Sequence, residues 1–231
     1  MNIIFYNLVV AIVGLAVSPF VVALIKRYSN EEKIFERSFI KDVKFDTRVS
    51  LMIPLIWIAL LYYHGIGFNF VLNAFVSVLL VISFFVDIKA QIIPNETNFI
   101  GFIVGIALAY FYLTQDYILG INKLLGIITG TGIFLLIALL AVIIYRKVGM
   151  GMGDVKLMGM LGLFFGFENI IQIFVFSFLI GAVVSIFLLI TKIKKADDYI
   201  PFGPFIVIAS FITMFLSATT TSQWLIENLV Y

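Results

Sequence analysis

The sequence predicts an all-α, polytopic integral membrane protein with about eight transmembrane helices. Of its 231 residues, 63% are hydrophobic and only 12% are charged, whereas soluble domains average about 25% charged residues. Several nearly uncharged runs have about 18 residues or more, enough to cross a hydrocarbon core about 30 Å thick. A transmembrane β-barrel would instead show short segments in which apolar and polar residues alternate.

The apolar runs define the expected helices in order along the chain. We expect them at residues 2–25, 50–64, 68–87, 98–115, 122–145, 155–168, 170–190 and 204–226. The first run lacks a basic start and ends in Lys26-Arg27, which indicates a retained anchor rather than a cleaved signal. The second and sixth runs are short, so a tilted or re-entrant segment is an alternative at both places.

The distribution of basic residues predicts the orientation in the membrane. All but one of the 15 Lys and Arg residues fall in loops that eight helices place on the same side; these are loops 26–49, 88–97, 146–156 and 191–203. The exception is Lys123. Because cytoplasmic loops are enriched in Lys and Arg, we expect these four loops in the cytoplasm and both termini outside the cell membrane.

The residue inventory excludes several kinds of chemistry. The chain has no cysteine and a single histidine, His64, so disulfides, thiolate catalysis and cysteine-built metal sites are excluded. A histidine metal cluster or a Ser-His triad is not expected either. Carboxylates, lysines and hydroxyls remain as catalytic groups, and we expect no metal and no cofactor.

Two aspartates lie where the membrane edge is expected. Asp87 ends the apolar run FVSVLLVISFFVD, and Asp154 follows GMGMG at the start of a helix. A carboxylate at this depth is costly unless it is paired or hydrated. In one interpretation both are juxtamembrane charges, and Asp154 caps its helix. In the other they form an acid pair that shares a proton near neutral pH. Such a pair hydrolyses a peptide bond by activating water and protonating the leaving group.

The stretch GMGMGDVK at residues 149–156 places three glycines on alternate positions before Asp154. Alternate glycines favour an open, unwound backbone, which an extended peptide can approach closely. Helix packing through small residues is the alternative, but it usually shows a spacing of four. The spacing matches neither a P-loop nor a dinucleotide-binding loop.

Three motifs resemble those of the type IV prepilin peptidases, a family of membrane aspartic proteases. GMGDVKL at residues 151–157 resembles the GxGD motif of that family, and DIKAQIIPN at 87–95 resembles its other aspartate segment. IPFGP at 200–204 is similar to a loop of the family near the C-terminus. The motifs occur in the order of the family, and the resemblance covers roughly residues 68–225.

The resemblance implies that Asp87 and Asp154 are the catalytic pair. The implied substrates are prepilin or pseudopilin precursors, whose short basic leader is cut at the cytoplasmic face just before a hydrophobic helix. Membrane lipid is a further expected partner, and nucleic acid is not expected. Lys156 would bind the lipid phosphate or, in the alternative, stabilise the charge of the acid pair. The residues expected to bind substrate or shape the site are Gly151, Gly153, Lys156, Pro94, Asn95, Pro201 and Gly203.

The same resemblance divides the chain into an N-terminal helical pair, residues 1–67, and a six-helix peptidase core, residues 68–231. Bacterial members commonly carry a larger cytoplasmic domain after the first helix, often with paired cysteines that bind zinc, and this domain is associated with N-methylation. Loop 26–49 is short here and has no cysteine. We therefore expect a peptidase without methyltransferase activity and a solvated loop on the lipid surface.

Two other classes of protein, a transporter or channel and a presenilin-type protease, predict different surroundings for the aspartates. A small ion or proton-coupled transporter or channel would use Asp87 and Asp154 to bind a cation or relay protons at a broken helix, but its acids would lie near the bilayer midplane. Presenilin-type proteases also carry GxGD, but they usually place the first aspartate in a Tyr-Asp pair. Here Val86 precedes Asp87.

Overall fold

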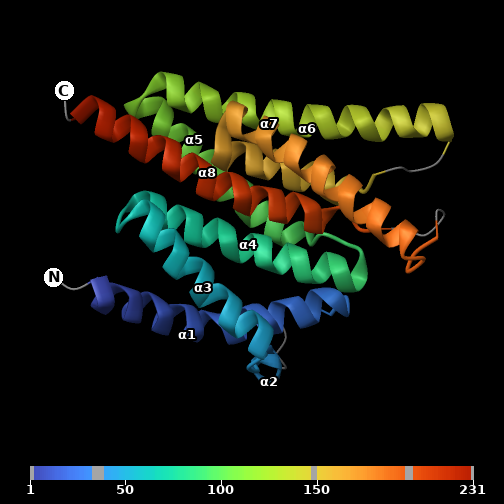
Figure 1. The fold of residues 1–231 in the computed structure, drawn as a ribbon, viewed down its shortest axis with the longest axis horizontal. Helices are drawn as coiled ribbons and strands as arrows, with labels where there is room; N and C mark the ends of the chain where they lie inside the picture. Colours follow the sequence, from blue (N-terminus) through green and yellow to red (C-terminus); the bar gives the residue numbers. More distant parts are fainter. Residues whose placement is uncertain (1–2, 33–38, 147–149, 196–199, 230–231) are drawn as a thin grey trace. The chain divides into compact units, whose positions relative to one another are not determined.

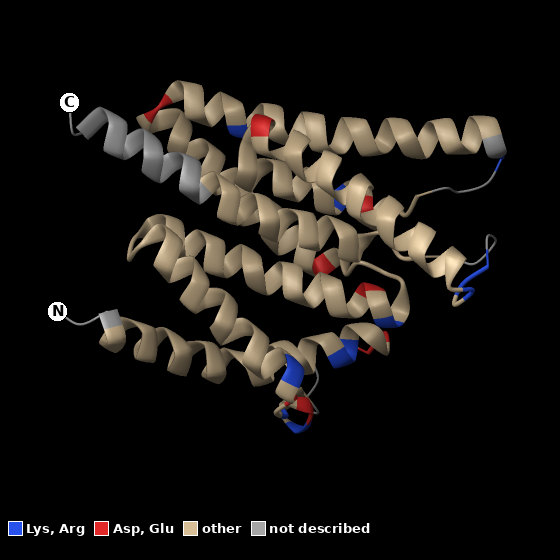
Figure 2. Cartoon of the chain, in the orientation of Figure 1, with Lys and Arg blue, Asp and Glu red and all other residues tan. Residues whose placement is uncertain are grey.

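The computed structural model describes residues 3–32, 39–146, 150–195 and 200–229, and every element in these ranges is a helix (Figure 1). The helices are α1 (Ile3–Ser29), α2 (Phe39–Asp42), α3 (Thr47–His64), α4 (Phe68–Ala90), α5 (Asn95–Gln115), α6 (Tyr117–Tyr145), α7 (Met152–Ile190) and α8 (Gly203–Leu229). Six of them, α1 and α3 to α7, are long and apolar enough to cross a membrane. Figure 2 shows how sparse charged residues are along the helices. The predicted all-α, polytopic class is confirmed, and the count of eight crossings stays a prediction.

Four helices, α3, α5, α6 and α7, begin three to five residues earlier than predicted, and aspartates cap two of them. The Asp46 carboxylate accepts hydrogen bonds from the backbone N–H groups of Arg48 (3.0 Å) and Val49 (3.5 Å), so α3 begins at Thr47 rather than at residue 50. The Asp116 carboxylate caps α6 in the same way, so this helix begins five residues before the predicted start at 122. A side-chain oxygen at the N-cap satisfies N–H groups that have no partner within the helix.

The chain forms two compact units. The first comprises Met1–Ala90 with Met214–Tyr231, and the second comprises Gln91–Thr213. The predicted boundary between residues 67 and 68, which separates a helical pair from a peptidase core, stays a prediction.

The first unit packs α1, α3 and α4 together. Helix α1 approaches α3 closely at Gly14, where an added methyl group would lie 3.0 Å from Cα of Pro54. The indole N–H of Trp57 in α3 donates a 3.0 Å hydrogen bond to Ser77 Oγ in α4. The Ser77 hydroxyl in turn donates to the carbonyl oxygen of Ala74 (2.7 Å), so both polar groups are satisfied inside an apolar core.

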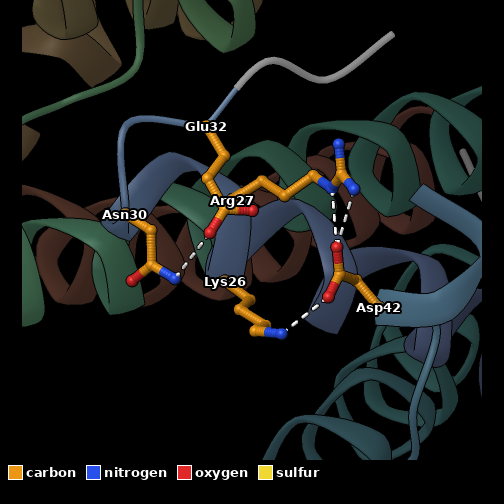
Figure 3. Close-up of polar contacts among 5 residues, drawn as sticks. All are labelled: Lys26, Arg27, Asn30, Glu32 and Asp42. Carbon is orange, nitrogen blue, oxygen red and sulfur yellow. Dashed lines mark hydrogen bonds and ion pairs between the residues drawn. The ribbon is translucent and has the colours of Figure 1, made fainter. Parts of the chain in front are cut away.

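Part of the charged loop is tied to α1 (Figure 3). Asp42 accepts a 2.6 Å hydrogen bond from Lys26 Nζ and a 2.8 Å hydrogen bond from Arg27 Nε. Arg27 has only 1% of its surface exposed, and its guanidinium carbon lies 5.4 Å from the centre of the Phe39 ring. Residues 40, 41 and 44–48 of this loop are exposed, as expected of a solvated segment, while Asp42 neutralises the buried Arg27. Residues 33–38 of the loop lie outside the described ranges.

We expect the variant Asp42→Asn to lower the apparent melting temperature of the protein in detergent at pH 7, because it leaves the Arg27 guanidinium buried without its anion. The hydrogen bonds from Lys26 and Arg27 hold the pKa of the Asp42 carboxyl below its ordinary value. The stabilisation is therefore present above the unfolded pKa, about 3.9, and is lost as pH falls through the folded pKa. Melting curves between pH 7 and pH 3 check this, since the difference between wild type and variant should shrink toward the acidic end. A constant difference at every pH would contradict the ionic explanation.

In the second unit, α6 packs on α7 through glycines. A methyl group on Gly126 would overlap the carbonyl oxygen of Gly162, and one on Gly162 would overlap the carbonyl oxygen of Gly126. The two backbones are thus in direct contact, as is usual where small residues line a helix interface in a membrane.

Helix α7 reverses direction at Gly166. This residue has φ 79° and ψ −180°, which are not helical angles. A methyl group on Gly130 of α6 would lie 2.5 Å from Met158 O and 3.0 Å from Ile170 Cγ1. Residues twelve positions apart in a straight helix are about 18 Å apart, so one point of α6 contacts both only if the chain doubles back. The break predicted between helices 155–168 and 170–190 is present, within a few residues.

Neighbouring residues of α6 cap both ends of this break. Asn122 Oδ1 accepts a 2.6 Å hydrogen bond from the N–H of Phe167, which begins the second half of α7. Lys123 Nζ donates a hydrogen bond to the carbonyl oxygen of Phe164, near the end of the first half. Asn169 Nδ2 donates to the carbonyl oxygen of Phe165 (3.1 Å). Lys123, the exception to the predicted charge distribution, therefore has a structural partner.

Candidate active site

Asp154 lies in the first turn of α7 and is 4% exposed. The residue before the helix is Gly151, whose extended backbone (φ −68°, ψ 137°) accepts a 3.1 Å hydrogen bond from the N–H of Asp154. The interpretation of Asp154 as the helix cap is therefore wrong, because Gly151 occupies that position. The N–H groups of the first turn lack helical partners, and their dipoles stabilise an anion placed there.

The two glycines of the GxGD motif have separate steric roles. A methyl group on Gly151 would lie 3.2 Å from Asp154 Oδ2 and would press on the carboxylate. A methyl group on Gly153 would lie 3.0 Å from Cβ of Ile93. The backbone is extended, as predicted, at Gly151 but not at Gly153, which lies within α7. Gly149 lies outside the described ranges.

The start of α5 lies against the start of α7. Pro94 is the residue before α5, and the Thr97 hydroxyl donates a 2.8 Å hydrogen bond to its carbonyl oxygen. Asn95 Oδ1 accepts a 2.8 Å hydrogen bond from Lys156 Nζ. Five of the predicted site-shaping residues thus meet in the second unit; they are Pro94, Asn95, Gly151, Gly153 and Lys156. The contact with Asn95 gives Lys156 a role in joining two helix starts, and its grip on lipid phosphate stays a prediction.

Asp87 lies in the last turn of α4, which continues to Ala90, and it is 4% exposed. It is buried beside Val86 (0% exposed) and one turn after Ser83 (1% exposed). Asp87 belongs to the first unit and Asp154 to the second. The pairing of the two carboxylates stays a prediction.

The IPFGP loop leads into α8, which begins at Gly203. The Phe202 ring packs on Phe178 of α7 with ring centres 4.9 Å apart and on Phe134 of α6 at 6.0 Å. A methyl group on Gly181 would lie 3.3 Å from Phe202 Cε2. This packing anchors α8, and the predicted contribution of Pro201 and Gly203 to a substrate groove stays a prediction.

Sequence reasoning missed Asn98, which is 2% exposed on the buried face of α5. The one available signal was a carboxamide within an apolar segment. Within the described residues, no three His, Cys, Asp or Glu side chains lie close enough together to hold a metal ion.

The helices define a polytopic membrane protein with two buried aspartates at helix ends. The model of the type IV leader peptidase family matches residues 74–186, which include Asp87 and Asp154. The resemblance predicted from the motifs is therefore confirmed over these residues. The IPFGP loop lies beyond the matched residues.

Three relatives illustrate the similarity, all named prepilin leader peptidase/N-methyltransferase. The protein of Xanthomonas campestris is 28% identical over 72% of this chain and 57% of its own length. The protein of Legionella pneumophila is 29% identical over 75% and 61%, and that of Bacillus subtilis is 32% identical over 71% and 65%. The chain thus spans less than two thirds of the length of these relatives. No solved structure matches the chain.

Proposed function

We propose that the chain is a membrane-embedded aspartic endopeptidase that removes the short basic leader from prepilin-like or pseudopilin precursors. The observation that carries this proposal is the family match over residues 74–186, which contains both buried aspartates. The names of the relatives support the substrate class. No comparison supports the ion or proton-coupled transporter that the sequence left open.

In the proposed reaction Asp87 and Asp154 act on one water molecule and one peptide bond. One carboxylate takes a proton from the water, whose oxygen attacks the scissile carbonyl carbon. The other, protonated, carboxyl donates its proton to the leaving nitrogen as the C–N bond breaks. Asp154 suits the first role, because the first turn of α7 stabilises an anion, whereas the last turn of α4 disfavours one at Asp87. Two carboxylates in such different surroundings can hold one proton between them.

The proposed orientation follows from the basic loops. With loops 26–49, 88–97, 146–156 and 191–203 in the cytoplasm, the starts of α5 and α7 lie at the cytoplasmic edge and both termini lie outside. The basic leader of the substrate then stays in water while its hydrophobic helix stays in lipid, so the scissile bond is held at the depth of the aspartates. Residues 68–231 form the proposed peptidase core.

We further propose that the chain lacks methyltransferase activity, although its relatives carry that activity in their names. Loop 26–49 has no cysteine, and its second half is occupied in neutralising Arg27 through Asp42. Bacterial members of the family commonly carry a larger domain in this region, often with paired cysteines that bind zinc, and that domain is associated with methylation.

The test is cleavage of synthetic precursors by the purified protein in liposomes. The precursors carry a short basic leader, a glycine and a hydrophobic segment, and mass spectrometry identifies the two products. S-adenosylmethionine is added to half of the samples. We expect cleavage after the glycine in all samples and no methylated product in any. A matched precursor with an acidic leader should be cut more slowly. Failure to cut any of several basic-leader precursors would contradict the proposed activity, and a methylated product would contradict only the missing methyltransferase.

A further inference from the structure

Asn98 is a buried carboxamide with no hydrogen-bond partner among the described residues. Its side chain lies in the first turn of α5 and is 2% exposed, yet neither Oδ1 nor Nδ2 makes a hydrogen bond within these residues. The neighbouring Thr97 shows the usual behaviour, since its hydroxyl donates to the Pro94 carbonyl oxygen. In the described part of the chain, Asn98 is the one side chain with two unpaired buried polar atoms.

Such an arrangement is costly unless something else binds there. A buried amide that loses its water without gaining partners destabilises a protein by about 1–3 kcal/mol, and each native example calls for an explanation. Leucine has the same branching and no polar atom, and it would avoid this cost. The amide therefore points to a polar ligand that reaches α5 during function.

Asn98 lies about one helical turn beyond the proposed catalytic level. Helices α5 and α7 run parallel, since their contacts advance together along both chains; these pair Ile93 with Gly153, Asn95 with Lys156, Phe102 with Gly159 and Gly105 with Leu163. Asn98 falls between the second and third of these contacts. It shares a face of α5 with Gly105, seven positions on, and Gly105 contacts Leu163 of α7. It is thus about 5 Å along the helix axis from the level of Asp154.

The chemistry of the side chain selects the ligand. A primary amide offers a donor and an acceptor side by side, and the backbone of one residue in an extended peptide presents the complementary acceptor and donor. Within a membrane a peptide that leaves its helix needs partners for each freed N–H and C=O group. An extended chain advances about 3.3 Å per residue, so 5 Å corresponds to one or two residues past the scissile bond.

We propose that Asn98 binds the backbone of the precursor one or two residues after the cleavage point, with Oδ1 accepting a substrate N–H and Nδ2 donating to a substrate carbonyl oxygen. This role rests on the proposed peptidase function and makes Asn98 a substrate-positioning residue. It holds the scissile bond in the extended form that the water activated by Asp154 attacks.

The experiment combines the variant Asn98→Leu with substrates in which an ester replaces one peptide bond. The ester removes a single N–H at the first or the second bond after the cleavage point and leaves the scissile amide intact. In the wild type we expect one of these esters to lower kcat/KM about 10-fold, the usual cost of one lost hydrogen bond to a buried partner. In the variant kcat/KM for the all-amide substrate should fall about 10- to 100-fold, and the same ester should cause no further loss.

Stability and a matched variant separate this role from a structural one. Because Asn98→Leu removes an unsatisfied polar group, we expect its apparent melting temperature to equal or exceed that of the wild type. Thr213→Val is the control, since Thr213 Oγ1 is also buried without a partner in the described chain but lies on α8; its kcat/KM and ester pattern should match the wild type. Asn98→Ala, which removes the same atoms without the bulk of leucine, serves as the second variant.

Each outcome has a distinct meaning. If the wild type cleaves but Asn98→Leu and Asn98→Ala keep full kcat/KM, or show the same ester losses as the wild type, the role of Asn98 is overturned and the peptidase function stands. If the wild type cleaves no precursor, the peptidase function itself is overturned. A lower melting temperature with an unchanged ester pattern would assign Asn98 a structural role instead.

Discussion

Replacing either Asp87 or Asp154 by asparagine is expected to lower the rate of precursor cleavage by about 10³-fold or more. Asparagine keeps the shape of the side chain but neither takes a proton from water nor donates an acidic one, and positioned acids and bases each contribute about 10²–10⁴-fold. Because the two groups act on the same bond, the double variant should be no slower than the slower single variant. Cleavage of a basic-leader precursor in liposomes, followed by mass spectrometry, measures all three rates.

Asp116→Asn is the matched control for these variants. Asp116 is also an aspartate at a helix start, where its carboxylate caps α6, and asparagine caps helices about as well. This variant should therefore cleave at the wild-type rate and melt at the wild-type temperature. A wild-type rate in Asp87→Asn or Asp154→Asn would remove that residue from the mechanism.

Replacing Gly166 by alanine is expected to lower the apparent melting temperature of the protein. With φ 79° and ψ −180°, Gly166 occupies a region of backbone conformation that is essentially confined to glycine and costs other residues about 1–3 kcal/mol. The added methyl group would also overlap Asn122 Oδ1. It would thereby displace the oxygen that accepts the N–H of Phe167.

Gly132→Ala provides the comparison. Gly132 lies in α6 and has no atom within 4 Å of the position of an added methyl group. Alanine should leave the melting temperature unchanged or raise it, because alanine is favoured over glycine in a helix by about 1 kcal/mol. Thermal unfolding of both variants in the same detergent measures the two changes in melting temperature. A stabilised Gly166→Ala variant would mean that α7 is continuous at this residue, since alanine favours an uninterrupted helix.

Hydrophobic runs were sufficient to predict the class of fold and most of the helices, including the break at Gly166. They were insufficient at the helix starts, where Asp46 and Asp116 extend α3 and α6 by hydrogen bonds to backbone N–H groups. Nor do they separate buried faces from lipid-facing ones, because both are apolar in a membrane protein.

The residues of the candidate site that belong to a sequence motif were predictable. Those whose role depends on packing against distant parts of the chain were not. Asp87, Asp154 and the residues around them were recognised from their order along the chain. The steric reason for Gly153 was not, because it depends on Ile93, a residue 60 positions earlier that only the folded chain brings near. Asn98 was missed for the same reason. Its lack of a hydrogen-bond partner in the described chain depends on which residues surround it in the fold.

The capping of α7 by Asn122 and Lys123 has a consequence for biogenesis. The ribosome makes α6 before α7, so both capping side chains have already been synthesised when the tip of the α7 hairpin is translated. Without them, the carbonyl oxygen of Phe164 and the N–H of Phe167 would lack the partners that α6 supplies. The order of synthesis thus makes both capping groups available before the reversal of α7 is complete.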